Sequence, residues 1–203
     1  MKRMILIIPV FMMLTTTVLA QHGGLGIKVG SPTYTFEDHP EYSKLINTLY
    51  ISVRLSRQMT IFIDSYFIET EGNPFSTGLE TETAMNQSIF SDKTTILGPM
   101  YHQNIGLFDL TAYGGVGFGW HSLRIGDKQR TIRETSKNHG AHFVFGLSYD
   151  LKKIPVDVFV EGRYARIFLN DEGAYTKFVP SPLHRDGQID LKFISAGFLV
   201  YFF

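Results

Sequence analysis

The chain has 203 residues, with 19 basic and 19 acidic side chains, 44% hydrophobic residues and no cysteine. The absence of cysteine excludes a disulfide framework and a thiolate metal site, and the balanced charge gives no reason to expect a nucleic-acid partner. The chain contains 17 Phe and 10 Tyr, yet no stretch after residue 20 approaches the run of about 18 apolar residues that a membrane-spanning helix needs. We therefore expect the apolar surface to lie on strands.

The first 20 residues have the pattern of a secretory signal. Lys2 and Arg3 form a short basic region, residues 5–14 are mostly apolar, and Val18-Leu19-Ala20 supplies the small-residue pattern of a cleavage site. We predict a cleaved signal peptide over residues 1–20 and one mature domain over residues 21–203, which is 183 residues (203 − 20). A retained amino-terminal anchor is the alternative.

Alternation of apolar and polar residues recurs along the mature chain and predicts strands with two different faces. In one segment, Leu49, Ile51 and Val53 share a face, while the residues between them are polar or aromatic. The pattern predicts eight strands, at about 24–31, 45–57, 59–70, 92–103, 106–122, 140–150, 155–169 and 189–203. The strand over 92–103 is the least regular, because Gly98-Pro99 interrupts it.

The predicted connections alternate between short and long. Three short turns lie near Arg57-Gln58, Asn104-Ile105 and residues 151–154. The four long connections are expected at about 32–44, 71–91, 123–139 and 170–188. Transmembrane barrels alternate in this way, with short periplasmic turns and long extracellular loops. We predict an all-β fold: an eight-stranded antiparallel up-and-down transmembrane β-barrel with four long extracellular loops and three short periplasmic turns.

The last predicted strand ends on aromatic residues. Phe203 is preceded at alternate positions by Tyr201 and Leu199, the spacing common at the end of small outer-membrane barrels. In this feature and in its strand pattern, the chain resembles the OmpA/OmpX-like eight-stranded outer-membrane barrels over residues 21–203, without their periplasmic domain. The resemblance implies an outer-membrane location in a Gram-negative-type bacterium. It also implies a carboxy-terminal signal (Leu199, Tyr201, Phe203) for the barrel-assembly machinery, contact with outer-membrane lipid and lipopolysaccharide, and a monomer.

Charged residues are expected inside the barrel, because each Arg or Lys on a lipid-facing wall would cost about 2–4 kcal/mol at the membrane midplane. Eight charged residues, four of each sign, fall on the more polar face of their predicted strands: Lys28, Arg54, Asp64, Asp109, Asp157, Glu161, Arg163 and Lys192. We predict a neutral interior charge network centred on Arg54, Asp64, Glu161, Arg163 and Lys192. Aromatic residues near predicted strand ends suit interfacial girdles: Tyr101, Trp120, Tyr149, Phe168, Tyr201 and Phe203.

Candidate catalytic and metal-ligating residues are sparse. Lipid A-modifying barrels use a His with a nearby Ser, but His121 and Ser122 are adjacent and should face opposite ways. The dipeptide Asp64-Ser65 lies in the middle of a predicted strand. His139 and His142 should also face opposite ways, and His39 lies among carboxylates in the first long loop. We predict no catalytic residue, no cofactor and no metal site.

The third predicted loop is basic. Arg124, Lys128, Arg130, Arg133 and Lys137 outweigh Asp127 and Glu134 by three charges (5 − 2). This loop either packs against its acidic neighbours or contacts lipopolysaccharide phosphates or an external ligand. We expect a non-enzymatic barrel with a structural or adhesive surface role, and an external protein or matrix component is a candidate ligand. The alternatives are a small pore, a soluble exported ligand-binding barrel and a lipid A-modifying enzyme.

Overall fold

A computed structural model describes residues 22–35, 42–43, 45–71, 88–106, 109–127, 133–169 and 188–202. The predicted signal segment, residues 1–20, lies outside these ranges. The described residues form nine strands: β1 (His22–Thr35), β2 (Tyr42–Ser43), β3 (Ile46–Arg54), β4 (Met59–Glu71), β5 (Ser88–Asn104), β6 (Leu110–Asp127), β7 (Arg133–Asp150), β8 (Val156–Phe168) and β9 (Gln188–Phe202). Within the same ranges, no helix is long and apolar enough to cross a membrane.

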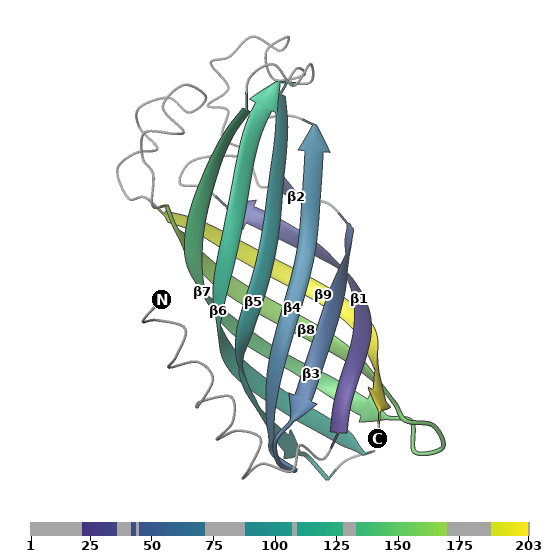
Figure 1. Ribbon diagram of the computed structural model, residues 1–203. Coiled ribbons are helices and arrows are strands. Elements are labelled where there is room, and N and C mark those ends of the chain that lie inside the picture. The colour runs from purple at the N-terminus through teal and green to yellow at the C-terminus, as the bar shows by residue number, and fades with distance from the viewer. Residues whose placement is uncertain are drawn as a thin grey trace, which may run out of the picture.

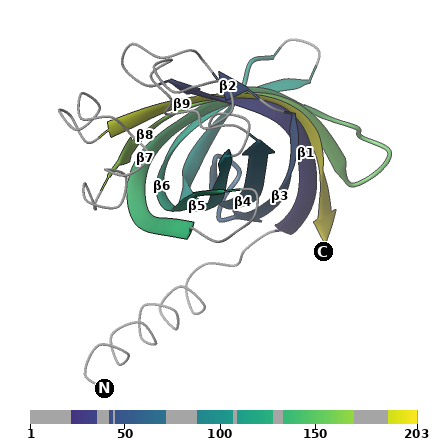
Figure 2. The same cartoon turned by 90° about the horizontal axis from the view of Figure 1, so that it is seen from above.

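Eight of these strands close into an antiparallel barrel. Each strand from β3 to β9 pairs with the next, β3 pairs with β1, and β1 pairs with β9 over thirteen residue pairs from Gly23↔Phe202 to Thr35↔Asp190. The short β2 pairs only with the end of β1. Figures 1 and 2 show the tilted strands and the closure between β1 and β9. The predicted eight-stranded up-and-down barrel is therefore confirmed.

Three tight turns lie at one end of the barrel. In the first, Ser56 Oγ accepts hydrogen bonds from the backbone N–H groups of Gln58 and Met59. In the second, Gly106 has a φ of 68°, which glycine adopts without steric cost, and its N–H donates to Asn104 Oδ1 over 2.6 Å. The third, over residues 151–155, is closed by backbone hydrogen bonds between Leu151 and Val156 and between Ile154 and Leu151. The other connections join strand ends at the opposite end of the barrel (Figure 1).

The connection between β6 and β7 is shorter than predicted. Both strands extend well into the expected loop 123–139, and their pairing continues as far as Gly126↔Arg133. The reason is that alternation persists there: Leu123, Ser136 and Asn138 are buried on the inward face. Only residues 128–132 separate the two strands.

The irregular segment Gly98-Pro99 lies within one continuous strand. Both residues are in register with β4, as the pairs Phe62↔Gly98 and Ile61↔Pro99. A Cβ on residue 98 would lie 1.9 Å from the carbonyl oxygen of Val116 on β6. Glycine therefore permits a close backbone approach here, which accounts for the break in the sequence pattern.

The outward face of the barrel is apolar. Large hydrophobic side chains from every barrel strand are exposed there, including Ile27, Leu49, Ile63, Leu97, Phe118, Phe145, Val160, Ile194 and Phe198. A soluble monomer rarely exposes a continuous surface of this kind, whereas a lipid-facing wall requires one. This arrangement contradicts the soluble ligand-binding alternative, whose apolar face would line the interior.

The apolar band has a definite edge. On β9 the outward residues run from Phe202 through Phe198 and Ile194 to Lys192, ten residues from the turn end (202 − 192). With a rise of about 3.3 Å per residue and a tilt near 40°, ten residues span about 25 Å, the height of a lipid-facing band. Outward charges on other strands lie at similar or greater distances from the turns: Glu69, Lys93, Arg124, Lys137 and Arg166.

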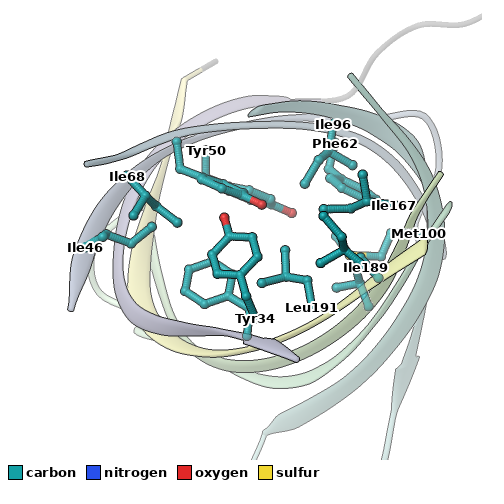
Figure 3. Close-up of a cluster of buried hydrophobic side chains, with 14 of the residues drawn as sticks. Tyr34, Ile46, Tyr50, Phe62, Ile68, Ile96, Met100, Ile167, Ile189 and Leu191 are labelled. Carbon is teal, nitrogen blue, oxygen red and sulfur yellow. The ribbon is translucent and has the colours of Figure 1, made fainter. Parts of the chain in front are cut away.

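The interior is filled by side chains. Figure 3 shows aromatic and aliphatic residues from several strands pointing into the barrel, among them Tyr34, Tyr50, Phe62, Ile96 and Leu191. These five residues are at most 4% exposed. An eight-stranded barrel is just wide enough for such filling.

Candidate functional site

Four charged side chains meet in the middle of the barrel, and we call them the interior quartet: Lys28 from β1, Asp64 from β4, and Glu161 and Arg163 from β8. Lys28 Nζ lies 2.5 Å from Asp64 Oδ2 and 2.6 Å from Glu161 Oε1. Arg163 Nη2 lies 2.5 Å from Asp64 Oδ2 and 3.0 Å from Glu161 Oε1. None of the four residues is more than 3% exposed. Two cations and two anions make the quartet neutral, as buried charges require.

Aromatic rings enclose the interior quartet. Lys28 Nζ lies 5.1 Å from the ring centre of Tyr50, and the Arg163 guanidinium lies 5.9 Å from the ring centres of both Phe62 and Phe193. Ring faces at these distances attract cations, more strongly where water is excluded. The quartet and these rings together occupy the interior at this level.

The structure brings together three of the five residues predicted to centre the charge network: Asp64, Glu161 and Arg163. Arg54 faces the interior but lies nearer the turns, where its Nη2 donates a 3.1 Å hydrogen bond to the Tyr201 hydroxyl. That hydroxyl donates to Asp157 over 2.6 Å. Arg54 therefore belongs to a separate cluster. The period-2 pattern gave the correct face for this residue but not its height along the barrel.

The predicted inward positions of Lys192 and Asp109 are wrong. Lys192 is exposed on the outer wall, while its neighbour Phe193 is buried inside. Lys192 lies at the edge of the apolar band, where a charge on the outer wall no longer faces the hydrocarbon and costs little. Asp109 lies in a turn and forms an exposed ion pair of 2.5 Å with Lys152. This hydrogen bond raises the pKa of Lys152.

A second buried polar cluster lies between the interior quartet and the end opposite the turns. Asp92 accepts hydrogen bonds from Tyr34 and Thr94, each over 2.8 Å, and its Oδ2 lies 3.3 Å from His121 Nδ1. His121 Nε2 lies 3.1 Å from His142 Nε2, and the two rings are nearly parallel, with their centres 5.2 Å apart. This distance fits an N–H···N hydrogen bond between the rings.

The sequence analysis missed this second cluster, because Asp92 stands at the start of the predicted strand 92–103 and was not included among the inward charged residues. The signal in the sequence was period-2 alternation. Every second residue of this segment faces inward and is fully buried: Phe90, Asp92, Thr94 and Ile96. An acidic residue at one position of that face was enough to obscure the pattern.

A vestibule of about 480 Å³ lies at the turn end of the barrel. Its lining is mainly polar and includes Arg54, Gln58, His102, Asn104, Asp150 and Asp157. From the vestibule towards the middle of the barrel, Tyr50 and Phe159 pack with their ring centres 5.7 Å apart. The interior quartet lies beyond these two rings. The vestibule therefore ends at a filled layer.

The residues considered for catalysis do not converge. Asp64 points inward, whereas Ser65 points outward and donates to the Thr94 carbonyl over 3.2 Å. His121 is inward and Ser122 outward, as predicted. Thr94 lies 2.9 Å from His121, but its hydroxyl is fully buried and donates to Asp92, so a substrate could not reach it.

Over the described ranges, no group of three or more His, Cys, Asp or Glu side chains is placed to hold a metal ion. His142 is buried and His139 exposed, so they face opposite ways as predicted. His39 and its acidic neighbours lie outside the described residues.

The predicted basic patch is only partly described. Arg124 and Lys137 are exposed on the outward faces of β6 and β7, so they lie on strands and not in a loop. Arg133 begins β7, its side chain is not described, and Lys128 and Arg130 lie outside the described residues.

The predicted carboxy-terminal signal has an unexpected orientation. Leu199 is buried and Tyr201 faces inward, whereas Phe198 and Phe202 point outward; Phe203 lies outside the described residues. Of the predicted girdle, four residues are exposed on the outer wall: Tyr101, Trp120, Tyr149 and Phe168. Tyr201 does not belong to it, because it faces Arg54 and Asp157 inside the barrel.

No family model and no curated protein matches the chain. Solved structures do match in fold. The structure of Neisserial surface protein A aligns over 89% of this chain and 97% of its own, with a TM-score of 0.61 and 12% identity. Ail, the attachment invasion locus protein of Yersinia pestis, aligns over 89% and 98%, with a TM-score of 0.54 and 10% identity. The outer membrane protein AlkL aligns over 89% and 90%, with a TM-score of 0.54 and 15% identity. At these identities the likeness concerns the fold, and the fold is that of outer-membrane barrels.

Proposed function

We propose that this chain is a closed, non-enzymatic outer-membrane barrel that serves a structural or adhesive role at the cell surface. Its interior is a packed core that stabilises the barrel. The outer wall and the connections opposite the tight turns make the contacts with other molecules. In this proposal residues 1–20 are removed on export, and residues 21–203 form the mature barrel.

The observation that carries the proposal is the filled interior. The interior quartet lies among aromatic rings, with none of its four residues more than 3% exposed. A path for ions along the axis would have to pass between opposite charges that lie 2.5–3.0 Å apart. Opening such a path would separate buried ion pairs, which is strongly unfavourable.

The orientation of the barrel follows from the positions of its connections. In outer-membrane barrels the short turns face the periplasm and the longer connections face outward. The three described turns therefore belong on the periplasmic side, and residues 36–41 and 72–87 lie in extracellular connections. A proposed external protein or matrix ligand would bind there. Ail, whose fold this chain shares, is an attachment and invasion protein by its name, and one of its structures holds a heparin analogue.

The barrel is further proposed to be monomeric, because the eight barrel strands, within the described residues, pair in a closed ring and offer no open edge to a second copy. Assembly would use the carboxy-terminal strand and the barrel-assembly machinery, with Phe198 and Phe202 presenting the outward aromatic groups.

Two measurements test the proposal. Purified barrel in planar bilayers should give no steady channels, whereas regular conductance steps would support the small-pore alternative and refute the closed interior. Cells that carry the intact barrel should bind an immobilised sulfated glycosaminoglycan or matrix protein more than cells in which residues 72–87 are replaced by a short Gly-Ser linker. Equal binding by the two strains would count against an adhesive role for that connection.

A further inference from the structure

The vestibule at the turn end of the barrel has charged groups of opposite sign at its rim. Arg57, in the turn between β3 and β4, and Asp150, at the end of β7, both line the vestibule and are exposed. Neither side chain forms a salt bridge with a described residue. In the ring of eight barrel strands, β7 lies four strands from β3 in either direction, so the two residues stand on opposite sides of the mouth.

A second pair of opposite charges lines the same vestibule and is held in place by Tyr201. Arg54 donates to the Tyr201 hydroxyl over 3.1 Å, and its guanidinium lies 4.9 Å from the centre of the same ring. The hydroxyl donates to Asp157 over 2.6 Å. Asp157 is directly paired with Asp150 across β7 and β8, so the two carboxylates share one side of the vestibule. The lining is therefore positive next to β3 and negative next to β7 and β8.

This separation of charge favours one class of ligand. Two like charges at directly opposite positions of neighbouring strands repel each other, and a cationic group placed beside Asp150 and Asp157 would relieve that repulsion. An anionic group would gain in the same way beside Arg54 and Arg57. An ion with a single charge is attracted by one side and repelled by the other. A ligand that carries one charge of each sign is attracted by both sides.

The size of the vestibule fits a short peptide. Its volume of about 480 Å³ lies within the range of about 300–1,000 Å³ that small-molecule sites occupy. Eight strands about 4.8 Å apart, with a tilt near 40°, place opposite backbones about 16 Å from each other. A peptide extends by at most about 3.5 Å per residue, so two or three residues span the space that remains once Arg57 and Asp150 reach inward. Gln58 and Asn104 also line the vestibule and can bond peptide groups as donors and acceptors.

We propose that the vestibule binds a short peptide with free amino and carboxyl ends. Its carboxylate lies against Arg57 and Arg54, and its ammonium group lies against Asp150 and Asp157, through charge-assisted hydrogen bonds. Because the vestibule ends at a filled layer, the peptide is held at the turn end and is not conducted. This binding activity goes beyond the proposed surface role and does not depend on adhesion at the other end of the barrel.

The test is an NMR titration of the folded, heat-modifiable barrel in detergent micelles, with trialanine as the probe. We expect saturable binding to the unaltered protein. N-acetyl-trialanine and trialanine amide each lack one terminal charge, and each should bind at least about threefold more weakly, the scale of one exposed ion pair.

Two rim variants identify which end of the peptide meets which residue. In D150N the penalty for acetylation of the peptide should shrink while the penalty for amidation stays, and in R57Q the reverse should hold. The control variants D109N and K153Q each remove an exposed charge at the same end of the barrel, from residues that do not line the vestibule. Both controls should bind trialanine as tightly as the unaltered protein.

Three outcomes would overturn the proposal: no saturable binding of trialanine, equal binding of the free and capped peptides, or equal losses in the rim and control variants. If the rim variants fail to fold, the capped peptides test the same charges on the unaltered protein. Channel recordings are independent of these results, so steady conductance would refute the closed interior without bearing on the peptide site.

Discussion

Removal of one member of the interior quartet should destabilise the barrel strongly. Arg163 contacts both carboxylates, Asp64 at 2.5 Å and Glu161 at 3.0 Å. In Arg163→Met the two carboxylates would share only Lys28, leaving one negative charge uncompensated where no residue of the quartet is more than 3% exposed. Breaking a buried pair in this way costs about 3–5 kcal/mol. Methionine keeps most of the volume of the side chain, so the loss would report on charge more than on packing.

The assay is urea unfolding of the barrel refolded into lipid vesicles, followed by the loss of the fast-migrating unheated band on electrophoresis. The matched variant combines Arg163→Met with Asp64→Asn, which restores neutrality and leaves Lys28 paired with Glu161 at 2.6 Å. The loss in the free energy of unfolding of the double variant should be smaller, by about 1–3 kcal/mol, than the sum of the losses of the two single variants. An Arg163→Met barrel with an unchanged unfolding midpoint, or strictly additive losses, would refute the reasoning that the quartet is held by mutual neutralisation.

Three further changes test other parts of the structure by the same unfolding assay. Phe198→Lys places a cation near the middle of the apolar band and should cost about 2–4 kcal/mol, whereas Lys192→Ile, at the edge of the band, should cost little; equal effects would mean that the edge of the band is misplaced. Asp92→Ala leaves several buried donors without an acceptor and should cost at least about 1–3 kcal/mol, so a neutral result would contradict the second polar cluster. Gly98→Ala would bring a Cβ to within 1.9 Å of a backbone oxygen and should cost at least about 1–3 kcal/mol, while Gly114→Ala, with its nearest atom at 3.7 Å, should be tolerated; the reverse order would overturn the register of β5 against β6.

Period-2 alternation was sufficient to predict the barrel and the inward face of most strands. Asp64, Glu161 and Arg163 could be placed inside because a charge on a lipid-facing wall is costly, and the structure has them there. The same rule failed at Lys192, because the free-energy cost of a charge on the outer wall depends on its depth in the membrane. That depth cannot be assigned without knowing where the apolar band ends.

Which inward residues meet one another could not be predicted, because partners across the interior depend on the stagger between strands. Arg54 and Arg163 both face inward, yet only Arg163 reaches Asp64. Lys28 was assigned to the inward face but not to the centre of the network, although its amine joins two carboxylates. Strand ends were also uncertain, because β6 and β7 continue through residues whose polarity is typical of loops.

The interior quartet also has a consequence for the order in which the barrel forms. Three members of the quartet lie on β4 and β8: Asp64, Glu161 and Arg163. The second cation, Lys28, lies on β1 and is 133 positions from Glu161 along the chain. Before β1 joins β9, the sheet already contains all four charges through the pairing of β1 with β3, but Lys28 lies near one edge and Glu161 and Arg163 lie near the other. Closure of the seam between β1 and β9 therefore brings Lys28 to Glu161 and Arg163 to Asp64. We expect an open sheet, whose opposite charges are held apart, to enter the bilayer less readily than the closed barrel.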